Sequence, residues 1–116
     1  MYWADWDIIP RIMRADVDGH NAVAIVDTDL HWPNGVAIDH DQQTLYWTEA
    51  YLNRIEMADL DGANRKVLLN KDLPHPYAIA VYEVRPRGYT VYYDGMKKGC
   101  EAIICLSDVM AWPFRR

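Results

Sequence analysis

The strongest constraint on this chain of 116 residues is an internal repeat with a period of about 43 residues. Residues 15–19 (ADVDG) recur as residues 58–62 (ADLDG), and residues 2–5 (YWAD) recur as residues 46–49 (YWTE). Separate blocks that keep the same step over so short a chain indicate a repeated structural unit. Such units bury their flat faces against their neighbours.

The complete unit predicts four short antiparallel strands, at residues 36–38, 44–48, 54–60 and 66–69. Alternation along the second strand places Leu45 and Trp47 on one face and Tyr46 on the other. Four strands in a repeat of about 40–45 residues are typical of a β-propeller blade. The sequence therefore predicts an all-β fold.

Turn chemistry separates these strands. Asn34-Gly35 indicates a turn before the first strand, and Asp61-Gly62 indicates a hairpin turn between the third and fourth, where glycine supplies a positive φ. A helix over residues 55–69 is the competing interpretation. The apolar residues of that segment hold no helical face and Asp61-Gly62 interrupts it, so we favour strands.

An ordered series of short motifs extends over residues 1 to about 83. They are Tyr2-Trp3-Ala4-Asp5-Trp6, Pro10-Arg11-Ile12, Asp18-Gly19, Trp32-Pro33-Asn34-Gly35, Leu45-Tyr46-Trp47, Arg54-Ile55-Glu56, Asp59-Leu60-Asp61-Gly62-Ala63-Asn64-Arg65 and Leu73-Pro74-His75-Pro76. The series resembles the YWTD (class B) repeats of the low-density lipoprotein receptor, its related receptors and nidogen. The resemblance implies a partial six-bladed β-propeller with about two to three four-stranded antiparallel blades. We expect a partial blade lacking its first strand at residues 1–32, a complete blade at residues 33–76, and a diverged or incomplete third blade and tail at residues 77–116.

Two features depart from the family pattern. Glu49 stands where the family has Asp, and we expect its longer side chain to weaken a short buried hydrogen bond. After Glu83 the match decays. Val91-Tyr92-Tyr93-Asp94 is a candidate for the next Tyr-Trp strand, and the tail from Gly95 is either a diverged blade or an unrelated extension.

The resemblance also divides the candidate residues into structural and functional sets. The structural core of the repeat is expected to comprise Tyr2, Trp3, Asp5, Gly19, Tyr46, Trp47 and Gly62. The candidate ligand-binding residues are Trp32, Asn34, His75 and Tyr77, near the start of the inner strands, where the family's ligand face lies. Trp32 and Tyr77 can serve as exposed recognition aromatics or equally pack around the central channel.

Two further roles, a pH switch formed by histidines and a calcium site formed by acidic pairs, are interpretations that we do not favour. His31 and His75 flank prolines at equivalent points of the repeat, and acid-triggered ligand release is known in this family. Loop histidines without a switch role are the simpler interpretation. Asp16/Asp18 and Asp59/Asp61 fit turns better than calcium, because a calcium loop needs further oxygen ligands at fixed steps.

Composition and missing motifs narrow the function. The net charge of −5 and the lack of a basic stripe argue against a nucleic-acid partner. No Gly-x-Ser-x-Gly, phosphate-binding glycine loop or His-Glu-x-x-His occurs, so we predict a binding protein without a cofactor or metal, not an enzyme. Cys100 and Cys105 provide one possible disulfide or buried thiols.

The function implied by the resemblance is that of a protein-binding module in a receptor ectodomain, which acts in ligand binding, endocytosis or Wnt co-receptor signalling. Expected partners are lipoprotein-like, Wnt-antagonist-like or laminin-like extracellular proteins, together with neighbouring epidermal-growth-factor-like modules and the remaining blades. The expected location is the extracellular side of a single-pass membrane receptor. The alternatives are a secreted nidogen-like basement-membrane propeller, a truncated non-functional product and, less favoured, an enzyme on a propeller scaffold.

The chain holds less than half of a six-bladed ring, and Met1 falls at the start of a second strand. No basic start followed by an apolar run marks a signal peptide, and no apolar stretch approaches the roughly 20 residues that cross a bilayer. We expect a fragment of a longer polypeptide, or a chain that self-associates because its end blades expose apolar surface. A compact monomer in sedimentation would contradict this expectation.

Overall fold

The chain consists of β-strands joined by short loops. The structure, a computed structural model, describes residues 1–71, 73, 75–83, 89–95, 100–105 and 110–115, with side chains up to Val81. The strands in these ranges are β1 (Tyr2–Asp5), β2 (Arg11–Arg14), β3 (Val23–Val26), β4 (Pro33–Asp39), β5 (Thr44–Glu49), β6 (Arg54–Asp59), β7 (Lys66–Leu69), β8 (Pro76–Glu83), β9 (Tyr89–Gly95), β10 (Cys100–Cys105) and β11 (Met110–Arg115).

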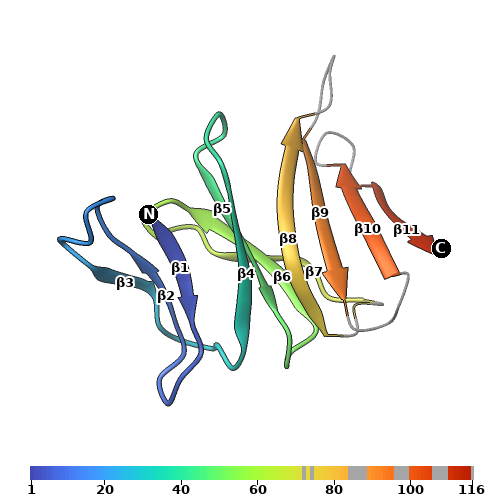
Figure 1. Cartoon of the computed structure of the whole chain (residues 1–116). Helices are drawn as coiled ribbons and strands as arrows, with labels where there is room; N and C mark the ends of the chain where they lie inside the picture. The colour runs from blue at the N-terminus through green and yellow to red at the C-terminus, as the bar shows by residue number, and fades with distance from the viewer. Residues whose placement is uncertain (72, 74, 84–88, 96–99, 106–109, 116) are drawn as a thin grey trace.

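The strands form three antiparallel sheets that lie side by side (Figure 1). The first sheet has the order β1-β2-β3, the second β4-β5-β6-β7, and the third β8-β9-β10-β11. Within each sheet, every strand therefore pairs with the strand that follows it in the sequence, as in the blades of a propeller. The predicted all-β fold with four-stranded antiparallel blades is confirmed.

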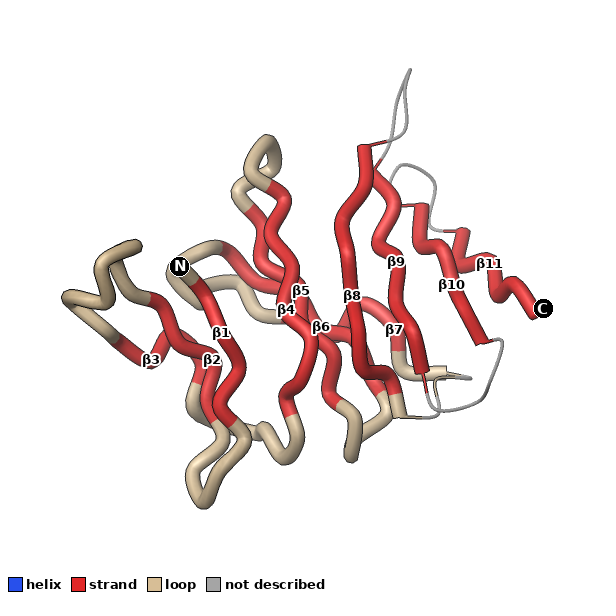
Figure 2. Tube along the Cα trace, in the orientation of Figure 1, coloured by secondary structure: helices blue, strands red, loops and turns tan. Residues whose placement is uncertain are grey.

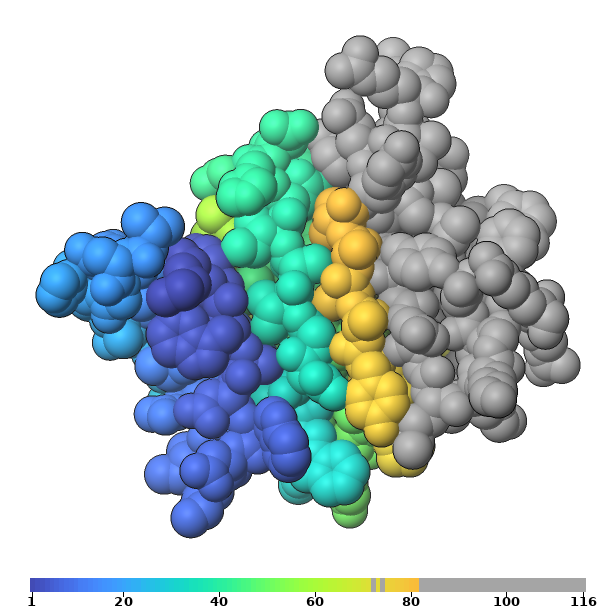
Figure 3. Space-filling view, in the orientation of Figure 1, coloured from blue at the N-terminus to red at the C-terminus, as the bar shows by residue number. Residues whose placement is uncertain are grey.

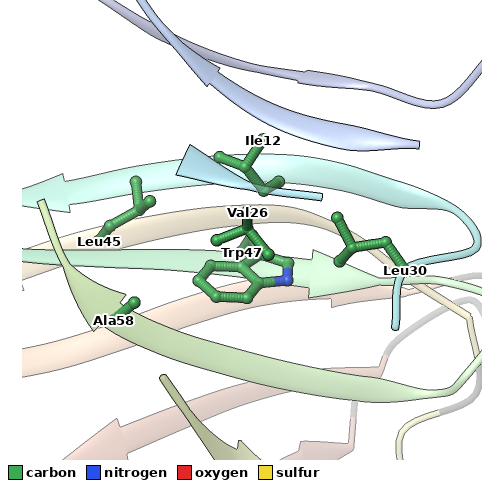
Figure 4. Close-up of a cluster of buried hydrophobic side chains, with 6 residues drawn as sticks. All are labelled: Ile12, Val26, Leu30, Leu45, Trp47 and Ala58. Atoms are coloured by element: carbon green, nitrogen blue, oxygen red, sulfur yellow. The ribbon is translucent and has the colours of Figure 1, made fainter. Parts of the chain in front are cut away.

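The second sheet is packed on both faces, and the alternation of β5 decides which residue meets which neighbour. Leu45 and Trp47 are fully buried against Ile12 and Val26 of the first sheet (Figure 4). Tyr46 points to the opposite face, in the cluster that packs against β8. The predicted division of these side chains is confirmed. Burying a large side chain of this kind contributes about 1.5–3 kcal/mol, so β5 anchors the stack.

The Asn34-Gly35 segment differs from the prediction. It lies inside β4, where the pairing with β5 shifts register between Pro33 and Val36, and not in a turn before the strand. A Cβ atom on Gly35 would collide with the carbonyl oxygen of Tyr77. Glycine stands here because the backbone of β8 comes close, so the interpretation as a turn is wrong.

The two Asp-x-Asp-Gly segments form equivalent turns. The Gly19 and Gly62 amides each donate to the carbonyl of the Asp three residues earlier at 2.9 Å, and both glycines have φ near +90° (88° and 89°). Asn21 and Asn64 donate from their side-chain amides to Asp16 and Asp59 at 2.7 and 2.6 Å. These carboxylates are therefore engaged in the hydrogen bonds of the turns.

The third sheet contains both cysteines. Residues 91–94 lie in β9, the second strand of this sheet, as the weak sequence match indicated. Cys100 and Cys105 stand at the two ends of β10. Five steps along a strand separate their Cα atoms by about 17 Å, whereas a disulfide needs roughly 4–7 Å. The possible disulfide between Cys100 and Cys105 is therefore excluded within this strand.

Candidate ligand-binding rim

Four exposed aromatic side chains gather at one end of the first two sheets and the start of the third. Trp6 lies in the β1–β2 loop, Trp32 directly before β4, Tyr51 in the β5–β6 loop and Tyr77 at the start of β8. Their exposed fractions are 62, 49, 55 and 40%. Figures 1 and 2 show these three loops along the lower edge of the molecule. We call these four residues the aromatic rim.

A pocket of about 190 Å³ opens within the aromatic rim. Its lining residues are Trp6, Trp32, Pro33, Asn34, Ala50 and Tyr77. They come from all three sheets, on the side of the molecule where β1, β4 and β8 lie next to one another (Figure 3). The lining is mostly apolar, and the Asn34 amide is its one side-chain hydrogen-bonding group besides the tips of the aromatic residues. Such a pocket suits one apolar side chain of a ligand.

Glu49 fixes the backbone that carries Trp32. Its carboxylate is fully buried and accepts hydrogen bonds from the amides of His31 at 3.1 Å and Trp32 at 2.6 Å. The Ala50 amide donates to the Trp32 carbonyl at 3.0 Å. The expectation that the longer Glu side chain weakens a short bond is wrong, because the bond to Trp32 is short. The loop before β4 is therefore tied to the end of β5.

Two arginines clamp the same loop from its other side. Arg54 donates to both the carbonyl and the carboxylate of Asp29, at 2.9 and 3.0 Å. Arg65 donates to the carbonyls of Thr28 and Asp29, at 2.6 and 3.0 Å. Buried Glu56 binds both guanidinium groups, at 3.1 Å to Arg54 Nε and 2.8 Å to Arg65 Nε. The hydrogen bond from Arg54 lowers the pKa of Asp29. The residues before Trp32 are thus held in place by charge-assisted hydrogen bonds.

The aromatic rings also support one another. The His31 ring stacks on Tyr51 with a centroid distance of 4.9 Å, and Trp32 meets Tyr51 edge-on at 5.5 Å. At the base of the rim, the buried Thr48 hydroxyl donates to the Tyr77 carbonyl at 2.8 Å and accepts from the Gly35 amide at 2.9 Å. This hydroxyl joins the second and third sheets beside the pocket.

His75 has a different environment from the other three ligand-binding candidates. Its backbone has a φ of 46°, and its amide donates to the Asn53 side chain at 2.9 Å. Its ring Nδ1 lies 2.9 Å from the Ala50 carbonyl, which can only accept, so Nδ1 donates this hydrogen bond. His75 is not among the pocket-lining residues, whereas Trp32, Asn34 and Tyr77 are brought together there.

The sequence reasoning did not select Trp6 for the ligand face. The repeat did carry a signal, because the residue equivalent to Trp6 in the complete unit is Ala50. A Trp at a position where the next unit has Ala is not required for packing, and both residues line the pocket. The residues expected in the structural core lie in different environments. Tyr46 and Trp47 are fully buried, Tyr2, Trp3 and Asp5 are half-buried, and Gly19 and Gly62 lie in turns, the former exposed.

Within the described ranges, no group of three or more His, Cys, Asp or Glu side chains is placed to hold a metal ion. No helix long and apolar enough to cross a membrane occurs in the part of the chain that the structure describes.

The family model of the low-density lipoprotein receptor repeat class B matches residues 1–40 and 43–83. The chain therefore belongs to this family of YWTD β-propeller repeats, whose propellers occur in receptors. Membership supports a ligand-binding module.

The relatives of known sequence include large receptors. The chain is 43% identical over 56 residues to the vitellogenin receptor of Drosophila melanogaster, which covers 48% of this chain and 3% of that protein. It is 42% identical over 55 residues to the low-density lipoprotein receptor-related protein 5-like protein of Homo sapiens, covering 47% of this chain and 22% of that protein. The chain thus spans a small part of the length of these relatives.

Solved structures show the same fold. A nidogen structure in complex with laminin matches with a TM-score of 0.85 and 31% identity, over 97% of this chain and 42% of that chain. A gluconolactonase from Xanthomonas campestris matches with a TM-score of 0.71 and 23% identity, over 93% of this chain and 35% of that chain. At that identity the second likeness shows the fold alone.

Proposed function

We propose that this chain is part of an extracellular β-propeller that binds protein ligands through the aromatic rim. The observation that carries the proposal is the pocket itself, around which Trp6, Trp32 and Tyr77 remain exposed although they come from three different sheets. Large aromatic residues at the centre of an interface contribute most of the binding energy of protein complexes. An apolar patch held in place in this way is typical of a recognition surface.

The energetic argument rests on preorganisation. The loop before Trp32 is held by buried Glu49 and by Arg54 and Arg65, so little conformational entropy remains to be lost when a ligand binds. Tyr and Trp side chains also have few rotatable bonds for the area they present. We infer that the pocket receives one apolar side chain and that the Asn34 amide orients the adjacent ligand backbone.

The proposed setting is the ectodomain of an endocytic or Wnt co-receptor-like receptor, with neighbouring growth-factor-like modules and further blades. The receptors among the relatives support this setting. A secreted, nidogen-like matrix protein is the second candidate, supported by the nidogen–laminin complex among the similar structures. The expected ligands are then lipoprotein-like or Wnt-antagonist-like proteins for a receptor and laminin-like proteins for a matrix protein.

Surface plasmon resonance with three purified probes tests the proposal: low-density lipoprotein, a secreted Wnt antagonist and laminin. We expect one probe to bind, and Trp32→Ala to weaken that binding by tenfold or more, about 1.4 kcal/mol or above. Val17→Ala is the matched control, because Val17 is 92% exposed in a loop away from the rim. Equal binding by both variants would contradict the assignment of the aromatic rim.

A further inference from the structure

Asn34 and Gly35 form the one Asn-Gly pair of the sequence. In such a pair the backbone nitrogen of the glycine can attack the side-chain carbonyl carbon of the asparagine, because glycine has no side chain that obstructs the approach. The Asn34 side chain is exposed where it lines the rim pocket, and it forms no hydrogen bond to the described residues. Its carbonyl carbon is therefore free to turn, and the state of the Gly35 nitrogen decides whether the two atoms react.

A bulge in β4 determines what the Gly35 nitrogen contacts. The pairing of β4 with β5 shifts register between Pro33 and Val36, so that Asn34 and Gly35 together oppose Thr48. A bulge leaves the extra residue without a partner in the ladder. The Gly35 amide donates instead to the Thr48 hydroxyl at 2.9 Å. Because Thr48 is fully buried, its side chain holds this amide away from water.

The backbone of β8 restricts the same glycine from the other side. A Cβ atom on Gly35 would collide with the Tyr77 carbonyl oxygen and would lie 3.0 Å from the Ile79 nitrogen. The Thr48 hydroxyl also donates to that Tyr77 carbonyl, at 2.8 Å. Attack on the Asn34 side chain requires the plane of the Asn34–Gly35 peptide to turn, and this rotation would swing the Gly35 Cα atom against β8. The contact that requires glycine here thus also opposes the reaction.

We propose that Asn34 is a site of spontaneous deamidation, which the folded sheet prevents through Thr48 and which reacts when β4 separates from β5 and β8. Hydroxide removes the Gly35 amide proton, and the nitrogen forms a bond to the Asn34 Cγ atom. The Cγ–Nδ2 bond breaks, and ammonia leaves with a proton taken from water. Water then opens the resulting succinimide at either carbonyl, which gives aspartate or isoaspartate. Water is the co-reactant, and no atom is oxidised or reduced.

Both products change the rim. Each places a carboxylate in a pocket whose other lining residues are apolar or uncharged, which is unfavourable for an apolar ligand group. Isoaspartate also adds one carbon to the backbone directly before Gly35, where β8 leaves no room. We therefore expect the isoaspartate form not to refold into β4, so that prolonged unfolding is recorded as a permanent loss of the rim. The effect on ligand binding rests on the proposed function, whereas the reaction itself does not.

The full chain and a synthetic peptide of residues 30–40 (LHWPNGVAIDH), incubated together at mildly alkaline pH, test the proposal. Peptide mapping by mass spectrometry follows the replacement of NH₂ by OH at Asn34. We expect the folded chain to react more slowly than the peptide by about tenfold or more, and the chain unfolded in urea to react as fast as the peptide. Equal rates in the folded chain and the peptide, or no reaction in the unfolded chain, would overturn the proposal.

Two replacements of Thr48 test its part in the protection. Thr48→Val removes the hydroxyl at similar size and should accelerate the reaction at Asn34 by about fivefold or more, whereas Thr48→Ser keeps the hydroxyl and should stay within about twofold of the unaltered chain. Ile12→Val is the control for a general loss of stability, because Ile12 is fully buried in the cluster on the other side of the sheet. Equal acceleration in Thr48→Val and Ile12→Val would assign the reaction to global unfolding and refute the role of Thr48.

The consequences for the rim are measured separately. After prolonged incubation in urea and refolding, the unaltered chain should recover less native tryptophan fluorescence than Asn34→Gln, whose longer side chain closes the corresponding ring much more slowly. Equal recovery would refute the permanent loss. Asn34→Asp, which carries the charge of one product, should bind the protein probe about tenfold more weakly than the unaltered chain. Because the mass measurements contain no ligand, failure of every probe to bind would refute the proposed function and leave the deamidation rates to decide this proposal.

Discussion

Replacement of Glu49 tests whether one buried carboxylate holds the backbone of the aromatic rim in place. In Glu49→Ala the amides of His31 and Trp32 lose the acceptor that they reach at 3.1 and 2.6 Å. A hydrogen bond to a charged group contributes about 1.5–3 kcal/mol net. Because Trp32 is half exposed, water can reach part of the freed loop. We therefore take the lower end of the range for each of the two bonds and expect a total loss of about 3 kcal/mol in the free energy of unfolding.

Graded replacements separate charge from shape. Glu49→Gln keeps one acceptor oxygen but directs an NH₂ group at one of the amides, and we expect a loss of about 2 kcal/mol. Glu49→Asp restores the residue of the family pattern and keeps both oxygens. It is one methylene shorter in a fully buried site, so we expect a loss of about 1 kcal/mol.

Urea unfolding followed by tryptophan fluorescence measures these differences, with Asp27→Ala as the control for loss of an exposed carboxylate. We expect stability to fall in the order unaltered chain, Glu49→Asp, Glu49→Gln and Glu49→Ala. The midpoint should move at constant m-value. A Glu49→Ala variant as stable as Asp27→Ala would refute the reasoning, because the two buried bonds would then contribute nothing.

Three further predictions concern the repeat. Gly62→Ala should be several kcal/mol less stable than Gly19→Ala in urea unfolding. Both glycines have a positive φ, but a Cβ atom at Gly62 would collide with the Ile25 carbonyl, whereas a Cβ atom at Gly19 would meet open space. Equal losses of stability in the two variants would refute this prediction. Trp47→Ala should cost about 3–5 kcal/mol in the same assay, and Trp3→Ala clearly less, because Trp47 is fully buried and Trp3 half-buried. Burial raises the pKa of Tyr46 to about 12, above its value near 10 in the unfolded chain, so the stability present below pH 10 should fall as the pH rises toward 12. A Tyr46→Phe variant should lose less stability over that alkaline range, and an unchanged pH profile would contradict the assignment.

Features that depend on local chemistry were predictable from the sequence. The alternation of Leu45, Tyr46 and Trp47 fixed which side chain enters which inter-sheet cluster, because successive residues of a strand point to opposite faces. The Asp-Gly turn at Gly62 followed from the conformational freedom of glycine. The weak match in residues 91–94 also marked a strand of the third sheet.

Part of the candidate site could be predicted as well. Trp32, Asn34 and Tyr77 were selected because they lie near the start of the inner strands, where the resemblance places the ligand face, and the structure brings them to one pocket. His75 was selected for the same reason but uses its ring to bond the Ala50 carbonyl. Equivalent positions share a backbone location, but the contacts of each side chain depend on its neighbours.

The sequence by itself determined the repeat, the strand order within each sheet and the faces that the strands bury, since all of these depend on patterns shorter than one unit. The tertiary structure decided what lies between units. Gly35 is required by the backbone of β8, Arg54 and Arg65 reach the carbonyl of Asp29, and Trp6 and Tyr77 line the same pocket although they come from the first and third sheets. These contacts join residues about 25 to 70 positions apart, and no local pattern encodes them. They arise because the packing of one twisted sheet on the next sets the distances between loops that the chain alone leaves free.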